Sequence, residues 1–197
     1  MKRDKPVCTY LLLTVNVGVF LILSFMGNTD SASFMADHGA LIAQKIAAGE
    51  NLYTLFTSMF LHFGMDHLAS NMIVLIAVGD PLERFIGSWK FMIIYLGGGL
   101  LGKLLSVAMD LRADQVVVSA GASGAVLAVL GAMIYVLIRH RGPVAGISLA
   151  RIVLAVAFTL YIGLTGSGIN NAAHIGGLIG GFALAVLVYH PHSRSAR

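Results

Sequence analysis

Two short motifs carry the residue types that acyl-transfer chemistry needs. Ser123 lies in Gly121-Ala122-Ser123-Gly124 at the start of one apolar stretch, and His174 lies in Ala173-His174-Ile175-Gly176-Gly177 at the start of another. A serine hydroxyl becomes an effective nucleophile when a neighbouring base takes its proton, and an imidazole can do this at neutral pH. The two residues therefore predict a Ser-His dyad, with Ser123 as nucleophile and His174 as general base.

The two residues are expected at the same depth in a membrane. The separation from Ser123 to Ile138, just before Arg139-His140-Arg141, equals that from His174 to Tyr189. In a helix this separation is about 22 Å. A bilayer core is about 30 Å thick, so both side chains lie below the opposite surface. Polar side chains are rare and costly there, and their coincidence indicates a functional site.

A third apolar stretch supplies further polar groups to this layer. His67 and Asn71 are four residues apart and share one helical face. His67 precedes Asp80 by about 20 Å of helix, which places it near the level of Ser123 and His174. The attack on a carbonyl creates an oxyanion that needs hydrogen-bond donors. We expect these donors to be the Asn71 amide, the His67 ring and the Ser123 backbone N–H.

Hydrolysis also requires water, which has to reach a site inside the membrane. The ends of these helices must therefore border a hydrated pocket. The segment Val117-Val118-Ser119-Ala120-Gly121 is expected to be non-helical backbone that lines this pocket.

The composition places these groups in a polytopic membrane protein. The chain is 57% hydrophobic and 11% charged, with a mean hydropathy of +0.85. These values exclude an ordinary soluble domain. We expect an all-α fold in a single domain over residues 1–197, with a structured outer loop at about 27–64. The six expected transmembrane helices cover about 9–26, 65–85, 89–109, 123–139, 149–165 and 171–189.

Basic residues set the expected orientation, because Lys and Arg are retained on the cytoplasmic side. With the amino terminus inside, most of the 13 Lys and Arg residues lie inside, and both termini are cytoplasmic. The inside residues are Lys2, Arg3, Lys5, Arg84, Lys90, Arg139, Arg141, Arg151, Arg194 and Arg197. The first apolar stretch is read as a retained helix, since no convincing signal-peptidase site follows it. Topology and anionic lipid explain the net charge of +4, so no nucleic-acid partner is expected.

Charged residues near the helix ends have simpler interpretations. Asp80, Glu83 and Arg84 fall at the inner end of the second helix, where we expect an ion pair and a lipid anchor. Lys103 is expected to extend to the outer interface. Cys8 is the only cysteine, which excludes an intramolecular disulfide.

Each polar residue also has an interpretation without catalysis. Ser123 alone could be a small packing residue, and His174, or His67 with Asn71, could form hydrogen bonds between helices. Asp66 adjoins His67 rather than the expected base and points about 100° away from it, which disfavours a three-residue triad. A zinc site from His62, Asp66 and His67 is also disfavoured, because no H-E-x-x-H pattern is present. His62 is then a residue that packs the loop or donates near the site.

On these residues the chain resembles the rhomboid family of intramembrane serine proteases. The matching motifs are His67-x-x-x-Asn71, Glu83-Arg84, Gly121-Ala122-Ser123-Gly124 and Ala173-His174-x-x-Gly177-x-x-x-Gly181. Each motif is weak alone, whereas their order and spacing across six helices are specific. The resemblance covers nearly the whole chain and implies the compact bacterial form of the family, with six helices and no appended domain.

The resemblance implies a nucleophile at Ser123, a base at His174, and oxyanion support from His67, Asn71 and the Ser123 N–H. It implies that the substrates are transmembrane segments of other proteins within the lipid bilayer. Such segments enter beside a mobile fifth loop, here Gly166-Ser167-Gly168. No cofactor and no metal are implied, and the sequence does not indicate an oligomeric state. Size and charge bias favour a bacterial inner membrane.

Two positions depart from the family pattern. Many bacterial members have Trp-Arg in the first outer loop where this chain has Tyr53-Thr54, and an aromatic ring where it has Leu127. The second change predicts that the imidazole is held less firmly. A catalytically inactive rhomboid-like factor that binds or chaperones membrane proteins is the alternative function. A small transporter is less well supported, because no inverted repeat is present.

Overall fold

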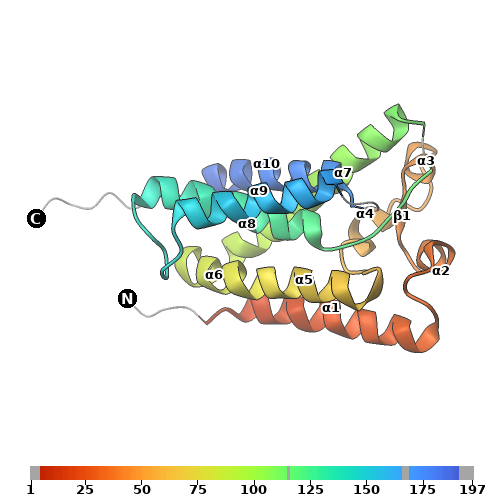
Figure 1. Cartoon of the computed structure of the whole chain (residues 1–197), viewed down its shortest axis with the longest axis horizontal. Helices are drawn as coiled ribbons and strands as arrows, with labels where there is room; N and C mark the ends of the chain where they lie inside the picture. The colour runs from red at the N-terminus through yellow and green to blue at the C-terminus, as the bar shows by residue number, and fades with distance from the viewer. Residues whose placement is uncertain (1–4, 115, 166–168, 191–197) are drawn as a thin grey trace, which may run out of the picture.

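Long apolar helices run along the longest axis of the molecule (Figure 1). The structure is a computed structural model that describes residues 5–114, 116–165 and 169–190. The long helices are α1 (Val7–Met26), α7 (Ser88–Arg112), α8 (Ser123–His140), α9 (Leu149–Thr165) and α10 (Asn171–Val188). Within the described part of the chain, α1, α7, α8 and α10 are long and apolar enough to cross a membrane. α9 is apolar but shorter, with 17 residues.

The second expected helix is a continuous rod made of three elements. α5 (Gly64–Val74), the π-helical turn η1 (Leu75–Gly79) and α6 (Asp80–Ile86) follow one another without a break. Pro81 explains the change of winding, because it lacks an N–H and its ring clashes with the carbonyl four residues earlier in an α-helix. A wider π turn before the proline relieves this conflict.

Short elements gather at one end of the bundle, which we call the loop end (Figure 1). They are α2 (Ala32–Asp37), β1 (Leu41–Ile42), α3 (Ala43–Ala47), α4 (Thr54–Thr57) and β2 (Val118–Ser119). β1 pairs antiparallel with β2, and Leu41 lies opposite Ser119. The sequence predicted a structured outer loop and non-helical backbone at Val117–Gly121, but it did not predict that the two segments pair as strands. The sheet joins the outer loop to the segment that precedes Ser123.

α8 forms the centre of the bundle and is buried along most of its length. It contacts α5, η1, α7, α9 and α10. By contrast, α1 and α9 turn large apolar side chains outward, with Phe25 90% and Leu154 71% exposed. An extensive apolar outer surface is suited to contact with lipid.

α7, α8 and α10 approach so closely that backbone meets backbone. A Cβ atom placed on Gly177 of α10 would meet the carbonyl group of Gly124 on α8. A Cβ atom on Gly102 of α7 would lie 2.6 Å from the carbonyl oxygen of Ala173. Helices in lipid associate through such small residues, because lipid tails give no hydrophobic driving force for helix contact.

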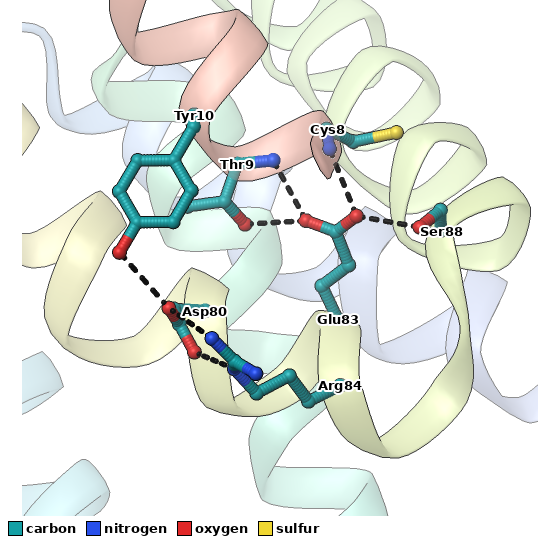
Figure 2. Close-up of polar contacts among 7 residues, drawn as sticks. All are labelled: Cys8, Thr9, Tyr10, Asp80, Glu83, Arg84 and Ser88. Atoms are coloured by element: carbon teal, nitrogen blue, oxygen red, sulfur yellow. Dashed lines mark hydrogen bonds and ion pairs between the residues drawn. The ribbon is translucent and has the colours of Figure 1, made fainter. Parts of the chain in front are cut away.

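A buried carboxylate on α6 joins this helix to α1 at the opposite end of the bundle from the loops. Figure 2 shows Glu83 accepting hydrogen bonds from the backbone N–H groups of Cys8 and Thr9 at 2.9 and 2.7 Å. It also accepts from Thr9 Oγ1 at 2.7 Å and Ser88 Oγ at 2.6 Å. Glu83 is fully buried. It therefore satisfies donors in the first turn of α1, where the N-cap residue Pro6 has no side-chain hydrogen bond.

The expected ion pair at this end is formed by only two of the three residues. Arg84 Nε donates to Asp80 Oδ1 at 2.5 Å, one turn away on α6. Glu83 is not part of this pair, and the prediction of a helix-end lipid anchor was wrong for it. The reason is rotation: residues 80 and 84 face outward together, while residue 83 faces α1.

We predict that Glu83→Gln lowers the free energy of unfolding by about 3 kcal/mol, because a carboxamide has one acceptor oxygen for the donors that the carboxylate receives, and its NH₂ group faces donors. Thermal or denaturant unfolding in detergent measures this loss. Asp80→Asn is the matched control, since it weakens a part-buried pair at the surface of the same helix. Equal stability of Glu83→Gln and wild type would contradict the prediction.

Candidate active site

Ser123 is the first residue of α8, and the turn before it is fixed by two hydrogen bonds. The Gly121 N–H donates to the Ser58 carbonyl oxygen at 2.9 Å, and the Ala122 N–H donates to His62 Nε2 at 3.4 Å. Ser123 itself is partly exposed. The hydroxyl is therefore presented at the end of a rigid helix rather than on a free loop.

The His67 ring and the Ser123 hydroxyl converge on Gly121. A Cβ atom on Gly121 would lie 2.9 Å from His67 Nε2 and 3.7 Å from Ser123 Oγ. Gly121 also has a φ of +134°, which disfavours other residues. Glycine at this position thus permits both the turn and the approach of the imidazole from α5.

His62 supports this turn from the loop that precedes α5. Its side chain is fully buried, and its ring packs edge-on against His67 with 5.2 Å between centroids. Burial lowers the pKa of His62 to about 3, and the charges of His67 and Lys103 act in the same direction. His62 is therefore neutral at physiological pH, and its Nε2 is free to accept the Ala122 N–H.

His174 lies in the first turn of α10, which begins at the loop end beside α8. Asn170 caps this helix, since its Oδ1 accepts from the Ala173 N–H at 2.9 Å. Asn170 Nδ2 donates to Ser106 Oγ at 2.6 Å and to Ser119 Oγ at 3.2 Å, which ties α10 to α7 and β2. His174 is 6% exposed. Hydrogen bonds from Asn170 thus hold the start of α10 to its own first turn, to α7 and to β2.

The first turns of α8 and α10 touch next to the two predicted catalytic residues. A Cβ atom on Gly124 would lie 3.1 Å from the carbonyl oxygen of Ala173, and these residues directly follow Ser123 and precede His174. Among the described residues, however, no hydrogen bond joins Ser123 Oγ to His174, and His174 Nδ1 has no partner. Nucleophile and base are often further apart before substrate binds.

Comparison with known proteins agrees with the sequence motifs. Residues 49–191 match the Rhomboid domain family. The chain belongs to the rhomboid family. The resemblance predicted from the sequence is therefore confirmed, and this rhomboid chain is an integral membrane protein with an all-α fold.

Three relatives illustrate the match. The chain is 36% identical over 190 residues to "Rhomboid protease GluP" of Bacillus subtilis, covering 96% of this chain and 36% of the relative. It is 37% identical over 168 residues to "RHOMBOID-like protein 6, mitochondrial" of Arabidopsis thaliana, covering 83% and 52%. It is 31% identical over 145 residues to "Rhomboid-type serine protease 2" of Emericella nidulans, covering 72% and 28%. The rhomboid chain thus spans from about a quarter to about half the length of these relatives.

The remaining predicted site residues have different outcomes. Asn71 is buried on α5, and its Nδ2 donates to the His67 carbonyl oxygen at 2.8 Å, which leaves one amide hydrogen for another acceptor. Asp66 is exposed, away from the buried His174. The predicted gating residues Gly166, Ser167 and Gly168 lie outside the described residues.

Both departures from the rhomboid pattern have a structural account. Tyr53 is 60% exposed beside Leu52 and Phe56, and these side chains form an apolar surface suited to the membrane interface. Thr54 is buried, and its hydroxyl donates to the Asn51 carbonyl oxygen at 2.8 Å, so it anchors its own turn. Leu127 is buried in the core on α8.

Two residues near the rhomboid site were missed or misjudged in the sequence. Asn170 was missed, although the preference of Asn for N-cap positions could have indicated it. His62 packs in the outer loop near the site, as expected, but its Nε2 accepts a hydrogen bond rather than donating one. Lys103 was expected to reach the outer interface, but it is 3% exposed on α7. That prediction was wrong because its helix face packs on the protein rather than on lipid.

Gly121→Ala should misplace His67, because the added methyl group meets the ring at 2.7 to 2.9 Å and the φ of +134° is strained for alanine. A displacement of about 1 Å in such a site can reduce the rate about 100-fold. The rate of labelling by a serine-reactive fluorophosphonate measures the effect.

Gly146→Ala is the matched control for this prediction. Gly146 also has a positive φ, +81°, but a Cβ atom there meets nothing within 4 Å. The control therefore tests backbone strain without a clash. Equal labelling of the two variants would show that the close approach to His67 is unimportant.

Proposed function

We propose that this protein is an intramembrane serine endopeptidase that cleaves peptide bonds in or near transmembrane segments of other proteins. Membership of the rhomboid family, with relatives that are named as rhomboid and serine proteases, supports the reaction class. The observation that carries the proposal is the contact between the first turns of α8 and α10, which brings Ser123 and His174 to one end of the bundle.

In the proposed reaction, Ser123 Oγ attacks the substrate carbonyl carbon while its proton moves to His174. The oxyanion that forms is stabilised by the His67 ring, the Asn71 amide and the Ser123 backbone N–H. Collapse breaks the C–N bond, and the proton on His174 passes to the leaving amine. A water molecule then gives its proton to His174 and hydrolyses the acyl-enzyme, which restores Ser123.

The proposed topology has six spanning rods: α1, the rod from Gly64 to Ile86, α7, α8, α9 and α10. Both chain ends would be cytoplasmic, as the distribution of Lys and Arg favours. The loop end then faces outward, and substrates would be cut near the outer boundary of the membrane. Gly166, Ser167 and Gly168 are proposed to gate their entry, and a bacterial inner membrane is the proposed location.

A second candidate function is a catalytically inactive rhomboid that binds or chaperones membrane proteins. The unformed hydrogen bond between Ser123 and His174 in the described structure favours this alternative. A serine-reactive probe separates the two functions. Labelling that depends on Ser123 supports the protease, and a lack of labelling supports the binding protein.

Ser123→Ala and His174→Ala are each expected to reduce cleavage of a reporter transmembrane segment by at least about 1,000-fold, since nucleophile and base act as a unit. Purified protein in proteoliposomes provides the assay, with product measured by gel mobility. Ser24→Ala and His140→Ala are matched controls, because the Ser24 hydroxyl donates to the Phe20 carbonyl oxygen of its own helix α1 and His140 lies at the other end of α8 from Ser123. Wild-type rates in either active-site variant would refute the dyad.

A further inference from the structure

A lysine is buried in the protein close to the proposed site, without an anionic partner in contact. Lys103 is 3% exposed on α7. Within the described residues it forms no hydrogen bond and no ion pair, and the pair at the other end of the bundle joins Arg84 to Asp80. A buried ammonium group without a counter-charge is costly, and intramembrane ionisable residues usually have a function.

The packing of α7 places the turns on either side of Lys103 against the starts of both site helices. A Cβ atom on Gly102 would lie 2.6 Å from the carbonyl oxygen of Ala173, directly before His174. A Cβ atom on Gly99, one turn earlier, would lie 2.8 Å from Ala125 Cβ on the first turn of α8. Side chains on a helix lean towards its N-terminus, so the Lys103 stem covers the turn that holds Gly99.

The charged and titratable groups around Lys103 are mainly those of the site. Its charge acts on His62 in the loop before α5, on His67 of α5 and on His174 of α10. Among the described residues, the carboxylate that interacts with it is that of Asp110, two turns further along α7. Asp110 Oδ2 accepts from Ser106 Oγ at 3.3 Å and is partly exposed, so it offsets the lysine charge only from a distance.

We infer that Lys103 is an electrostatic positioning residue for the proposed hydrolysis, supplying a fixed positive charge beside the dyad. The lysine lies on the face of α7 that packs against the first turn of α8, because Gly99, one turn earlier on the same face, meets Ala125. Its charge attracts the negative charge that develops on the substrate oxygen. The counter-charge that Lys103 lacks in the resting protein thus arises during the reaction, so its stabilisation is greatest in the transition state.

This inference rests on the proposed protease function, and its test separates the two. Lys103→Met removes the charge and keeps a flexible apolar side chain of similar length. We expect kcat for the reporter segment to fall about 10- to 100-fold with KM nearly unchanged, because the lost charge would act on the transition state more than on the bound substrate.

The unfolding temperature of Lys103→Met separates this inference from a purely structural role for the lysine. A structural role predicts a lower unfolding temperature, whereas this inference predicts no decrease. Removal of an unpaired buried charge leaves a fold equally or more stable, so the unfolding temperature of Lys103→Met should not fall. Lys103→Arg keeps the charge and should retain a higher kcat than Lys103→Met. Arg112→Gln, at the exposed end of the same helix, is the control and should change neither quantity.

Three results would overturn the inference while the protease assignment stands. They are a wild-type kcat in Lys103→Met, a loss in that variant that appears in KM rather than in kcat, or a kcat in Lys103→Arg that is no higher than in Lys103→Met. A lower unfolding temperature for Lys103→Met would also assign the lysine a structural role. If wild-type protein neither cleaves the reporter nor reacts with the fluorophosphonate, it is the protease proposal that fails.

Discussion

The site depends on direct contact between the backbones of α8 and α10. In lipid, apolar side chains gain nothing by leaving the solvent, so close packing and polar contacts must hold helices together. Gly124 and Gly177 allow the two helices to meet, and Gly102 brings α7 against the same place. Any side chain at these positions would separate the helix starts that carry Ser123 and His174. The chemistry proposed for this rhomboid is therefore possible only because several positions have no side chain.

Hydrogen bonds then fix the two ends of the bundle in different ways. At the loop end, neutral groups do this work: Asn170 holds the start of α10, and His62 holds the turn before α8. At the other end, the carboxylate of Glu83 receives donors from α1 and from the start of α7 (Figure 2). The buried negative charge of Glu83 is tolerated there because the N–H and O–H groups around it are oriented to donate to the carboxylate. The loop end keeps its one buried ammonium group, Lys103, without such partners.

Periodicity and composition predicted the main helices, since each long apolar stretch forms a helix close to its expected bounds. The family was also predictable, because the motifs around Ser123 and His174 occur in a specific order. The sequence could not reveal contacts between distant segments. The pairing of Leu41 with Ser119 depends on where two loops meet, and the burial of Lys103 depends on which face of α7 packs inward. The role of Glu83 was misjudged because its neighbours Asp80 and Arg84 form the expected pair, whereas its partners on α1 lie more than 70 positions away.

The π turn at Leu75–Gly79 determines how the side chains of α6 are rotated about the helix axis relative to those of α5. A π turn contains one more residue per hydrogen-bonded ring than an α turn, so the residues beyond it are displaced by about 100° relative to an unbroken α-helix. His67 faces the site on one side of this turn, and Glu83 faces α1 on the other. Loss of one residue here would give a smoother helix with the imidazole and the carboxylate on incompatible faces. The number of residues in this segment is thus constrained by the angle it sets between His67 and Glu83 around the helix axis. This constraint does not depend on which apolar side chains the segment contains.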